Sequence, residues 1–445
     1  MDTPAAAVLS DPAQKIVLPF PNLFEQLPTF RFHLNNGNWK YMGREKFKEL
    51  LKKVEEHKQN PHVGLWLYGT IGYGKSHLLA ALVCHLVSRG DTVVYVPDCP
   101  ILVRHPVRYL RMAMLLAWGN DSEVQEEIVA LETMEETLKF FHQVPTKAIS
   151  VVDQMNALED SHTDDVSDKI KQGVGAWLRA CSYRHKTIYS SLANCTTFLR
   201  MHQKQTNIIR VDVRGGLTAV RPYSLDLPIL VLTVLQAEVE EWWKEHPDID
   251  LDGYTREEVE DITGSIPLLL DSCIEEGKIN LSAEALVNVS NQIIEFMRNI
   301  KRNSSPKNFE WYTQIFPIDH DTTACLSRHF ECLAKCIACQ PVFLGCGDGL
   351  VDHRYFYQES NSKGNYTCGI ARETAARMLR QFQMNDFGDA NFLQALDHYI
   401  DNPSVTGFFI GQAVLSCISN CGLDLSKELR RPITTVMFLW RLSNL

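Results

Sequence analysis

The sequence has no apolar run long enough to cross a membrane, so we expect a soluble intracellular protein with no membrane partner. It also has no basic excess: the formal net charge of −10 excludes a surface that is basic all over and confines any nucleic-acid binding to a local patch. The opening residues MDTPAAAVLS have no basic start, and we expect no standard signal peptide. The 13 cysteines are odd in number and lie within apolar or helical patterns, which favours a reducing compartment over a disulfide framework.

One eight-residue stretch carries the strongest functional signal. Residues 69–76, GTIGYGKS, match the phosphate-binding pattern G-x-x-x-x-G-K-[ST], between an apolar strand and a helix. In such a loop, main-chain N–H groups and the helix start attract phosphate, the lysine adds a full charge, and the last hydroxyl can ligate Mg²⁺. The predicted nucleotide contacts are Gly69, Thr70, Ile71, Gly72, Tyr73, Gly74, Lys75, Ser76 and His77.

A second Mg²⁺ ligand is expected from Asp153, which ends the apolar run AISVV at residues 148–152. The next residue is Gln154, where many ATPases have a glutamate that activates water. Because a glutamine can orient water but cannot accept its proton, we predict slow hydrolysis. The predicted catalytic residues are thus Lys75, Asp153 and Gln154, and the predicted Mg²⁺ ligands are Ser76 and Asp153.

Further polar residues near this site have two interpretations. Ser190, Ser191 and Asn194 follow a predicted strand, and either contact the terminal phosphate or its attacking water, or form a turn of small polar residues. Four arginines are candidates for a contact to the terminal phosphate, although each is also an ordinary surface arginine by its pattern. They are Arg184, Arg200, Arg210 and Arg214.

The periodicity predicts an α/β fold, a P-loop NTPase parallel sheet with a helical lid, followed by an α+β C-terminal region. Strands are expected at residues 63–68, 92–98, 149–153 and 187–191. Four regions are expected: an extended leader with a Gly-Arg-Glu helix (1–60), the NTPase domain (61–235), the helical lid (236–307) and the C-terminal region (308–445). A basic, breaker-containing linker is expected from Arg298 to Lys307.

Two short motifs flank the NTPase pattern. Gly43-Arg44-Glu45 precedes the first helix, and Gly264-Ser265-Ile266-Pro267-Leu268 lies between lid helices. With the glycine loop, they resemble the signal-transduction ATPase branch of the AAA-like superfamily. That resemblance implies that the segment with Arg44 lies against the adenine, and that Pro267 touches the nucleotide and couples the lid to its phosphate state.

A wider resemblance covers most of residues 19–445. Its segments are residues 39–47, 67–82, 94–99 and 153–156, and further along 352–357, 366–372 and 407–416. They are similar to the NTPase module of Crinkler-type effector proteins of oomycetes and fungi. The family implies a ubiquitin-like secretion header, the NTPase and a PD-(D/E)-x-K nuclease-like domain, with entry into host cells and action in the nucleus.

The sequence departs from this family at both ends. We find no header of that kind, and position 411 is glycine where the first nuclease helix would carry a glutamate. No later Asp…Glu-x-Lys strand pair follows, and a two-metal nuclease needs several converging carboxylates. We therefore interpret residues 308–445 as a truncated nuclease-like region and expect no nuclease activity.

The predicted function is Mg²⁺-dependent binding and slow hydrolysis of a nucleotide, with ATP as substrate, acting as a conformational switch in a Crinkler-like effector. One alternative is a nucleic-acid-binding or nuclease-type effector that its NTPase regulates. Another is a nucleotide-binding scaffold with negligible turnover. Besides the nucleotide, a host protein, a nucleic acid and a second copy of the chain are the partner classes that stay open.

Overall fold

The computed structural model of the protein describes residues 5–24, 31–59, 64–69, 71–159, 166–181, 184–192, 208–213, 238–303, 356–358 and 364–386. The chain divides into two compact units. One comprises Met1–Glu260 and Gly264–Asn280, and the other comprises Asp261–Thr263 and Leu281–Leu445. None of the helices in the described part of the chain is both long and apolar enough to cross a bilayer.

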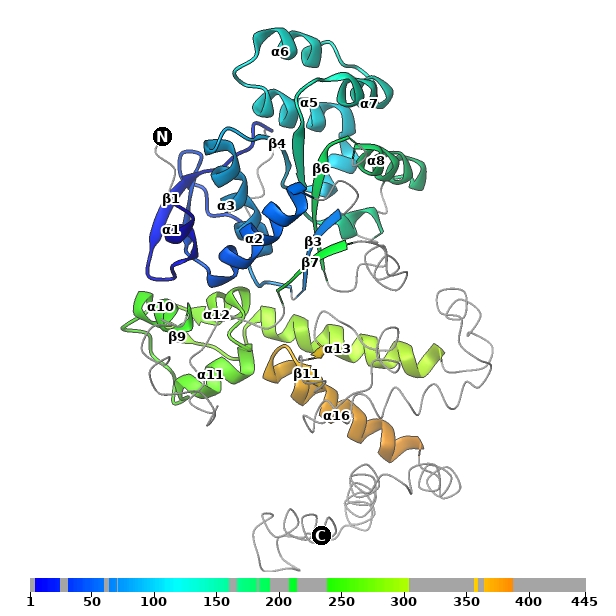
Figure 1. Ribbon diagram of the computed structural model, residues 1–445. Coiled ribbons are helices and arrows are strands. Elements are labelled where there is room, and N and C mark those ends of the chain that lie inside the picture. Colours follow the sequence, from blue (N-terminus) through cyan, green and yellow to red (C-terminus); the bar gives the residue numbers. More distant parts are fainter. Residues whose placement is uncertain are drawn as a thin grey trace, which may run out of the picture. The chain divides into compact units, whose positions relative to one another are not determined.

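A parallel sheet of five strands, in the order β4-β5-β6-β3-β7, forms the centre of the first unit (Figure 1). The strands are β3 (Gly64–Gly69), β4 (Thr92–Val96), β5 (Ala148–Val152), β6 (Lys186–Leu192) and β7 (Ile208–Val213). Because the carboxyl ends of parallel strands meet at one edge, the residues that follow β3, β4 and β5 are brought together there. The predicted α/β fold of P-loop NTPases is confirmed, with one strand more than the sequence indicated.

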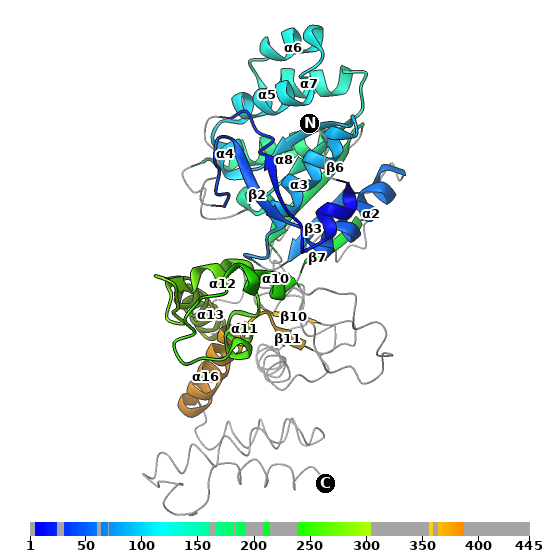
Figure 2. The same ribbon diagram turned by 90° about the vertical axis from the view of Figure 1, so that its left-hand side faces the viewer.

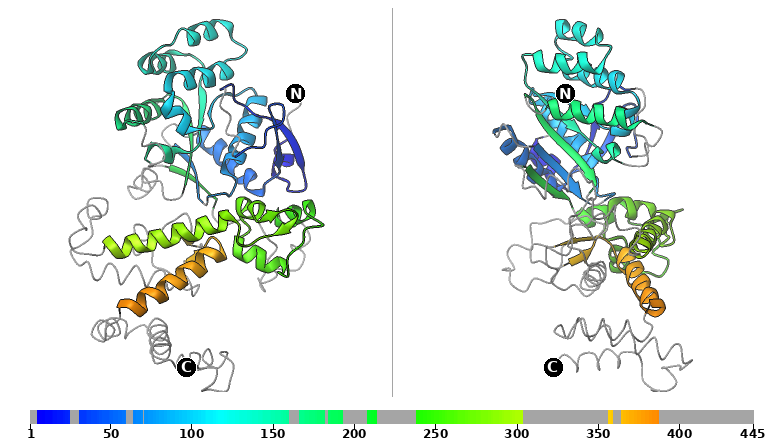
Figure 3. Two further views of the ribbon diagram at one scale, coloured as in Figure 1. Left: turned by 180° about the vertical axis from the view of Figure 1, so that it is seen from behind. Right: turned by 90° about the vertical axis from the view of Figure 1, so that its right-hand side faces the viewer.

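Both faces of this sheet are buried, which explains why its strands are apolar at successive positions. Along β3, Leu65 and Leu67 face one core and Trp66 and Tyr68 face the other. The first core is covered by α2 (Glu45–Gln59) and α3 (Lys75–Ser88). The second is covered by α4 (Cys99–Arg104), α5 (Pro106–Ala117), α6 (Ser122–Val129), α7 (Met134–Gln143) and α8 (Asp168–Cys181). Figure 3 shows these two helical layers from the opposite side.

The leader is folded rather than extended throughout. It forms α1 (Ala6–Ser10) and an antiparallel pair, β1 (Lys15–Pro19) with β2 (Asn38–Met42), which lies against α3 (Figure 2). The reason is the apolar pattern of these strands, since Leu18, Trp39 and Tyr41 are all buried against the first core. The Gly-Arg-Glu motif then leads directly into α2.

The predicted lid is divided between the two units. Helices α10 (Glu238–Glu245), α11 (Arg256–Thr263) and α12 (Pro267–Ser272) are followed by the small antiparallel pair β8 (Ile274–Glu275) and β9 (Lys278–Ile279). The last three residues of α11, Asp261–Thr263, and all residues from Leu281 onward belong to the second unit, so the next helix belongs to it as well.

That helix, α13 (Glu284–Asn303), corrects the predicted linker. The expected linker began at Arg298, but the helix continues to Asn303, since no glycine or proline interrupts the chain before Pro306. The second unit also contains the antiparallel pair β10 (Phe356–Gln358) and β11 (Gly364–Tyr366) and helix α16 (Gly369–Asp386). The rest of the predicted C-terminal region, including position 411, lies outside the described residues.

Candidate nucleotide-binding site

The glycine loop connects β3 to α3 at the carboxyl edge of the sheet. Three of its glycines have positive φ: Gly69 at 143°, Gly72 at 77° and Gly74 at 97°. Such angles are strained for residues with a Cβ, which explains why glycine is needed at these turns. Gly74 is the residue before the first turn of α3, so the loop ends at the positive end of that helix. Thr70, a predicted contact, lies outside the described residues.

Lys75 is held inside this loop. Its side chain is buried, and Nζ donates a hydrogen bond to the carbonyl oxygen of Gly69 at 3.1 Å. Burial lowers the pKa of Lys75 to about 8, although the nearby Asp153 carboxylate acts in the opposite direction. The loop therefore encloses a cation whose proton is unusually easy to lose until a negatively charged group arrives.

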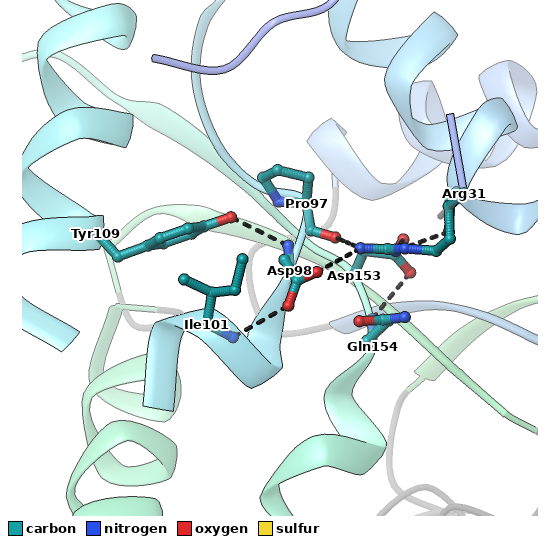
Figure 4. Close-up of polar contacts among 8 residues, drawn as sticks. Arg31, Pro97, Asp98, Ile101, Tyr109, Asp153 and Gln154 are labelled. Atoms are coloured by element: carbon teal, nitrogen blue, oxygen red, sulfur yellow. Dashed lines mark hydrogen bonds and ion pairs between the residues drawn. The ribbon is translucent and has the colours of Figure 1, made fainter. Parts of the chain in front are cut away.

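Ser76 and Asp153 both accept hydrogen bonds from one positively charged group, the guanidinium of Arg31. Figure 4 shows this guanidinium beside Asp153. Nη1 of Arg31 lies 3.2 Å from Ser76 Oγ and 3.1 Å from Asp153 Oδ2. Asp153 follows β5 and is almost fully buried, and its other oxygen accepts the main-chain N–H of Gln154 at 2.8 Å. The serine hydroxyl and the carboxylate predicted to ligate Mg²⁺ thus point at the same position.

A second carboxylate, Asp98, completes this cluster. It follows β4 as Asp153 follows β5, and its Oδ2 accepts the Arg31 Nη2 at 2.8 Å (Figure 4). The same Nη2 donates to the carbonyl of Pro97 at 2.9 Å. Burial raises the pKa of Asp98, and the guanidinium opposes that rise. The other oxygen of Asp98 caps α4 by accepting the N–H of Ile101.

The residues present fit a Mg²⁺ ion. Mg²⁺ is held in proteins by one or two oxygen ligands and keeps several waters. Here the oxygens of Ser76 and Asp153 already share one bound cation, the Arg31 guanidinium. Among the described residues, no group of three or more His, Cys, Asp or Glu side chains is arranged to hold a metal. The donors therefore suit the open, water-rich coordination of Mg²⁺ and not a closed structural metal site.

Gln154 has an unusual backbone and a free acceptor. Its φ is 62°, in the left-handed region that few non-glycine residues adopt. Its Oε1 is buried and has no hydrogen-bond partner among the described residues. A strained residue that carries an unpaired buried acceptor directly after Asp153 suits a role in holding a water or a ligand.

Ser190 and Ser191 lie within β6 and are buried as well. In the register of β6 with β3, Ser190 pairs with Leu67 and Ser191 with Tyr68, and within the described part of the chain neither hydroxyl has a hydrogen-bond partner. They belong to a regular strand, so the interpretation as a turn is wrong for these two residues. Asn194, Arg200 and Arg214 lie outside the described residues, and only the backbone of Arg210 is described. Arg184 is exposed and bonds to the carbonyl of His142.

Arg44 contacts both the glycine loop and the lid helix α10 through hydrogen bonds. Its Nε donates to Glu238 Oε1 at 2.9 Å, and its Nη1 donates to the carbonyl of Tyr73 at 3.0 Å. The guanidinium also lies 4.6 Å from the centre of the Tyr73 ring. Burial lowers the pKa of Arg44, but the charge and hydrogen bond of Glu238, together with Tyr73 and Tyr41, raise it by more, so the pKa is raised. A direct contact of Arg44 with the adenine stays a prediction.

The lid turn touches the loop at a second point. The N–H of Leu268 donates to the carbonyl of Gly72 at 3.3 Å, and a Cβ at Gly72 would lie 2.5 Å from Leu268 Cβ. Pro267 is the first residue of α12, one position before this contact. The other predicted contact, His77, packs its ring against Phe32, with 4.5 Å between ring centres.

The glycine loop, the strand order and the carboxylate at the end of β5 define a P-loop NTPase domain. No protein-family model matches the chain, and no curated protein matches it. Among solved structures, AMPPCP-bound DnaA from Aquifex aeolicus is 14% identical over 80% of this chain and 95% of that chain, with a TM-score of 0.29. A DnaI structure is 19% identical over 38% and 81%, with a TM-score of 0.23. A DNA replication initiation factor is 14% identical over 69% and 85%, with a TM-score of 0.27. Such low scores carry no argument about function, and the assignment rests on the loop and the sheet.

Sequence reasoning missed three residues of this site. Asp98 could have been found, because it ends a predicted strand in the same way as Asp153. Arg31 and Glu238 carried no signal, since neither lies in a motif. Arg31 bonds to Ser76, which is 45 residues away in the sequence. Glu238 bonds to Arg44, which is 194 residues away.

Proposed function

We propose that this chain is a Mg²⁺-dependent NTPase that uses ATP, hydrolyses it slowly and works as a conformational switch. The observation that carries the proposal is the convergence of the Ser76 hydroxyl and the Asp153 carboxylate on one cation beside a glycine loop. When bound, Mg²⁺ supplies positive charge that neutralises the phosphate oxygens of the nucleotide.

Each residue of the site has a role that follows from its position. Lys75 exchanges the carbonyl of Gly69 for phosphate oxygens, which are better partners for a buried ammonium. Gln154 offers its unpaired Oε1 to the attacking water and holds it in place. Because an amide does not accept a proton at neutral pH, no strong base completes the reaction, and turnover is slow.

The proposed switch uses the two connections between loop and lid. One is the hydrogen bond from Leu268 to Gly72, and the other runs from Glu238 through Arg44 to Tyr73. Any movement of the loop on binding phosphate alters both contacts and so changes the position of α10 and α12. Pro267, at the start of α12, is the residue through which we expect the phosphate state to be sensed.

Phosphate release from ATP and from GTP tests the enzymatic part. We expect slow release by the native chain, a loss of it in Lys75→Ala, and no change in Lys53→Ala, whose lysine pairs with Glu56 on the surface of α2. Equal rates for the native chain and Lys75→Ala would refute NTPase activity. Nucleotide binding without turnover, abolished by Lys75→Ala, would establish the scaffold alternative instead.

We further propose, from the sequence resemblance alone, that this NTPase serves a Crinkler-type effector that is secreted and acts in the host nucleus. Its partner there would be a host protein or a nucleic acid. Incubation with double-stranded DNA and Mg²⁺ tests the nuclease alternative. We expect no cleavage, and cleavage that Lys75→Ala leaves unchanged would identify a nuclease site in residues 308–445.

A further inference from the structure

Arg31 holds both predicted Mg²⁺ ligands, although it comes from the leader and not from any NTPase motif. Its guanidinium donates hydrogen bonds to Ser76, Asp153, Pro97 and Asp98, over distances of 2.8 to 3.2 Å. Only 13% of the Arg31 side chain is exposed. This is a built cation site occupied by the protein itself (Figure 4).

The next residue fixes Arg31 in this place. Phe32 is 1% exposed and packs against Phe20, Trp39 and His77, with ring centres 4.7, 5.3 and 4.5 Å away. His77 directly follows Ser76, so adjacent leader residues meet adjacent helix residues. The position of Arg31 therefore follows from core packing and not from a loose surface side chain.

The two terminal nitrogens of the guanidinium, Nη1 and Nη2, contact different groups. Nη2 is bound to Asp98 and the carbonyl of Pro97, neither of which is a predicted Mg²⁺ ligand. Nη1 is bound to Ser76 and Asp153, which both are. A metal ion can therefore displace Nη1 while Nη2 keeps the arginine beside the site.

We propose that Arg31 competes with the divalent cation for Ser76 and Asp153. Its guanidinium occupies these two ligands until Mg²⁺ binds together with a nucleotide. The cluster supports this order of events. Arg31 and Lys75 already balance the charges of Asp98 and Asp153, so Mg²⁺ alone would enter a site with no net attraction for it. The phosphates bring the negative charge that favours the exchange, and the released Nη1 can then bond to a phosphate oxygen. This inference rests on the proposed function, because the Mg²⁺ ion that displaces Arg31 is the one that binds with the nucleotide.

Binding of Mn²⁺ to the nucleotide-free protein, followed by the electron paramagnetic resonance signal of the free ion, tests the competition without any turnover. We expect Arg31→Ala to bind Mn²⁺ about tenfold or more tightly than the native chain, because charge-assisted hydrogen bonds no longer hold the ligands. Arg89→Ala removes an arginine that pairs with Glu55 on the surface and should leave binding unchanged.

Arg31→Lys separates competition from a general effect of charge. A lysine keeps the charge but has no fork that can bond to four acceptors, so we expect its Mn²⁺ affinity to lie between those of the native chain and Arg31→Ala. Native affinity in Arg31→Lys would show that charge alone matters, and native affinity in Arg31→Ala would show that Arg31 does not compete. Either result overturns the inference.

The proposed function is tested separately in the same variants. If the native chain binds ATP with Mg²⁺ but Arg31→Ala leaves Mn²⁺ affinity unchanged, only the competition is wrong. If no variant binds ATP at any Mg²⁺ concentration, the proposed function is wrong, whatever the Mn²⁺ curves show.

Discussion

The ion pair of Arg44 and Glu238 gives the sharpest prediction about stability. Glu238 is fully buried, and its Oε1 accepts both the Arg44 Nε and the main-chain N–H of Glu45. Glu238→Gln keeps an oxygen acceptor but leaves the buried Arg44 charge unpaired. Removing one partner of a buried ion pair lowers the free energy of unfolding by about 3–5 kcal/mol. Because Glu238→Gln keeps an acceptor, we expect its loss at the lower end, about 3 kcal/mol. Glu238→Ala, which removes both hydrogen bonds, belongs near the upper end.

Urea unfolding followed by tryptophan fluorescence measures this cost, since Trp242 and Trp243 lie on the same helix as Glu238. The control is Glu240→Gln, an exposed position on α10 where a change within about 0.5 kcal/mol is expected. Adding Arg44→Met to Glu238→Gln should recover part of the loss, because no unpaired charge is left. If Glu238→Gln is as mild as Glu240→Gln, or if the double variant loses the full sum, the pair does not hold α10 to the loop.

The remaining predictions concern the loop and its chemistry. Gly72→Ala places a Cβ against Leu268 and should lower both thermal stability and nucleotide affinity. Its control is Gly90→Ala, at a glycine with a similar φ and open space around it, where the effect should be smaller. Equal effects of the two substitutions would show that the lid contact is dispensable. Gln154→Glu supplies a base and should raise the rate of phosphate release by about 10² or more, whereas an unchanged rate would mean that proton transfer is not limiting. Because the pKa of Lys75 is about 8 without nucleotide, and bound phosphate favours its charged form, ATP affinity should be level below pH 7 and fall as the pH rises above 8. Isothermal titration of the native chain across this range checks the slope, and an ATP affinity that stays level above pH 8 would contradict the reasoning.

The sequence predicted the central strands well, because β3, β4 and β5 are mostly apolar runs that are buried on both faces. It did not predict β7. That strand reads IIRVDV, pairs only with β3 at the edge of the sheet, and has the mixed polarity that a loop can also have. The sequence also predicted a linker from Arg298, where α13 in fact continues to Asn303, because basic and polar residues are typical of linkers when no packing is known.

Of the site, the sequence predicted what local motifs encode. Ser76 in the first turn of α3 and Asp153 after β5 lie at one cation, as the two motifs require, while their binding of Mg²⁺ stays a prediction. Arg31, Asp98 and Glu238 are set by tertiary packing, where buried charges find partners from distant segments. Sequence motifs therefore predict the residues of the loop but not the charged residues that surround it.

Equilibrium binding of ATP to the nucleotide-free chain, with and without Mg²⁺, tests the central claim most directly. We predict binding that Mg²⁺ strengthens in the native chain, a loss of that strengthening in Asp153→Asn, and a loss of binding in Lys75→Ala. ATP affinity that is the same in all three proteins, with or without Mg²⁺, would contradict the assignment of this loop as a Mg²⁺–nucleotide site.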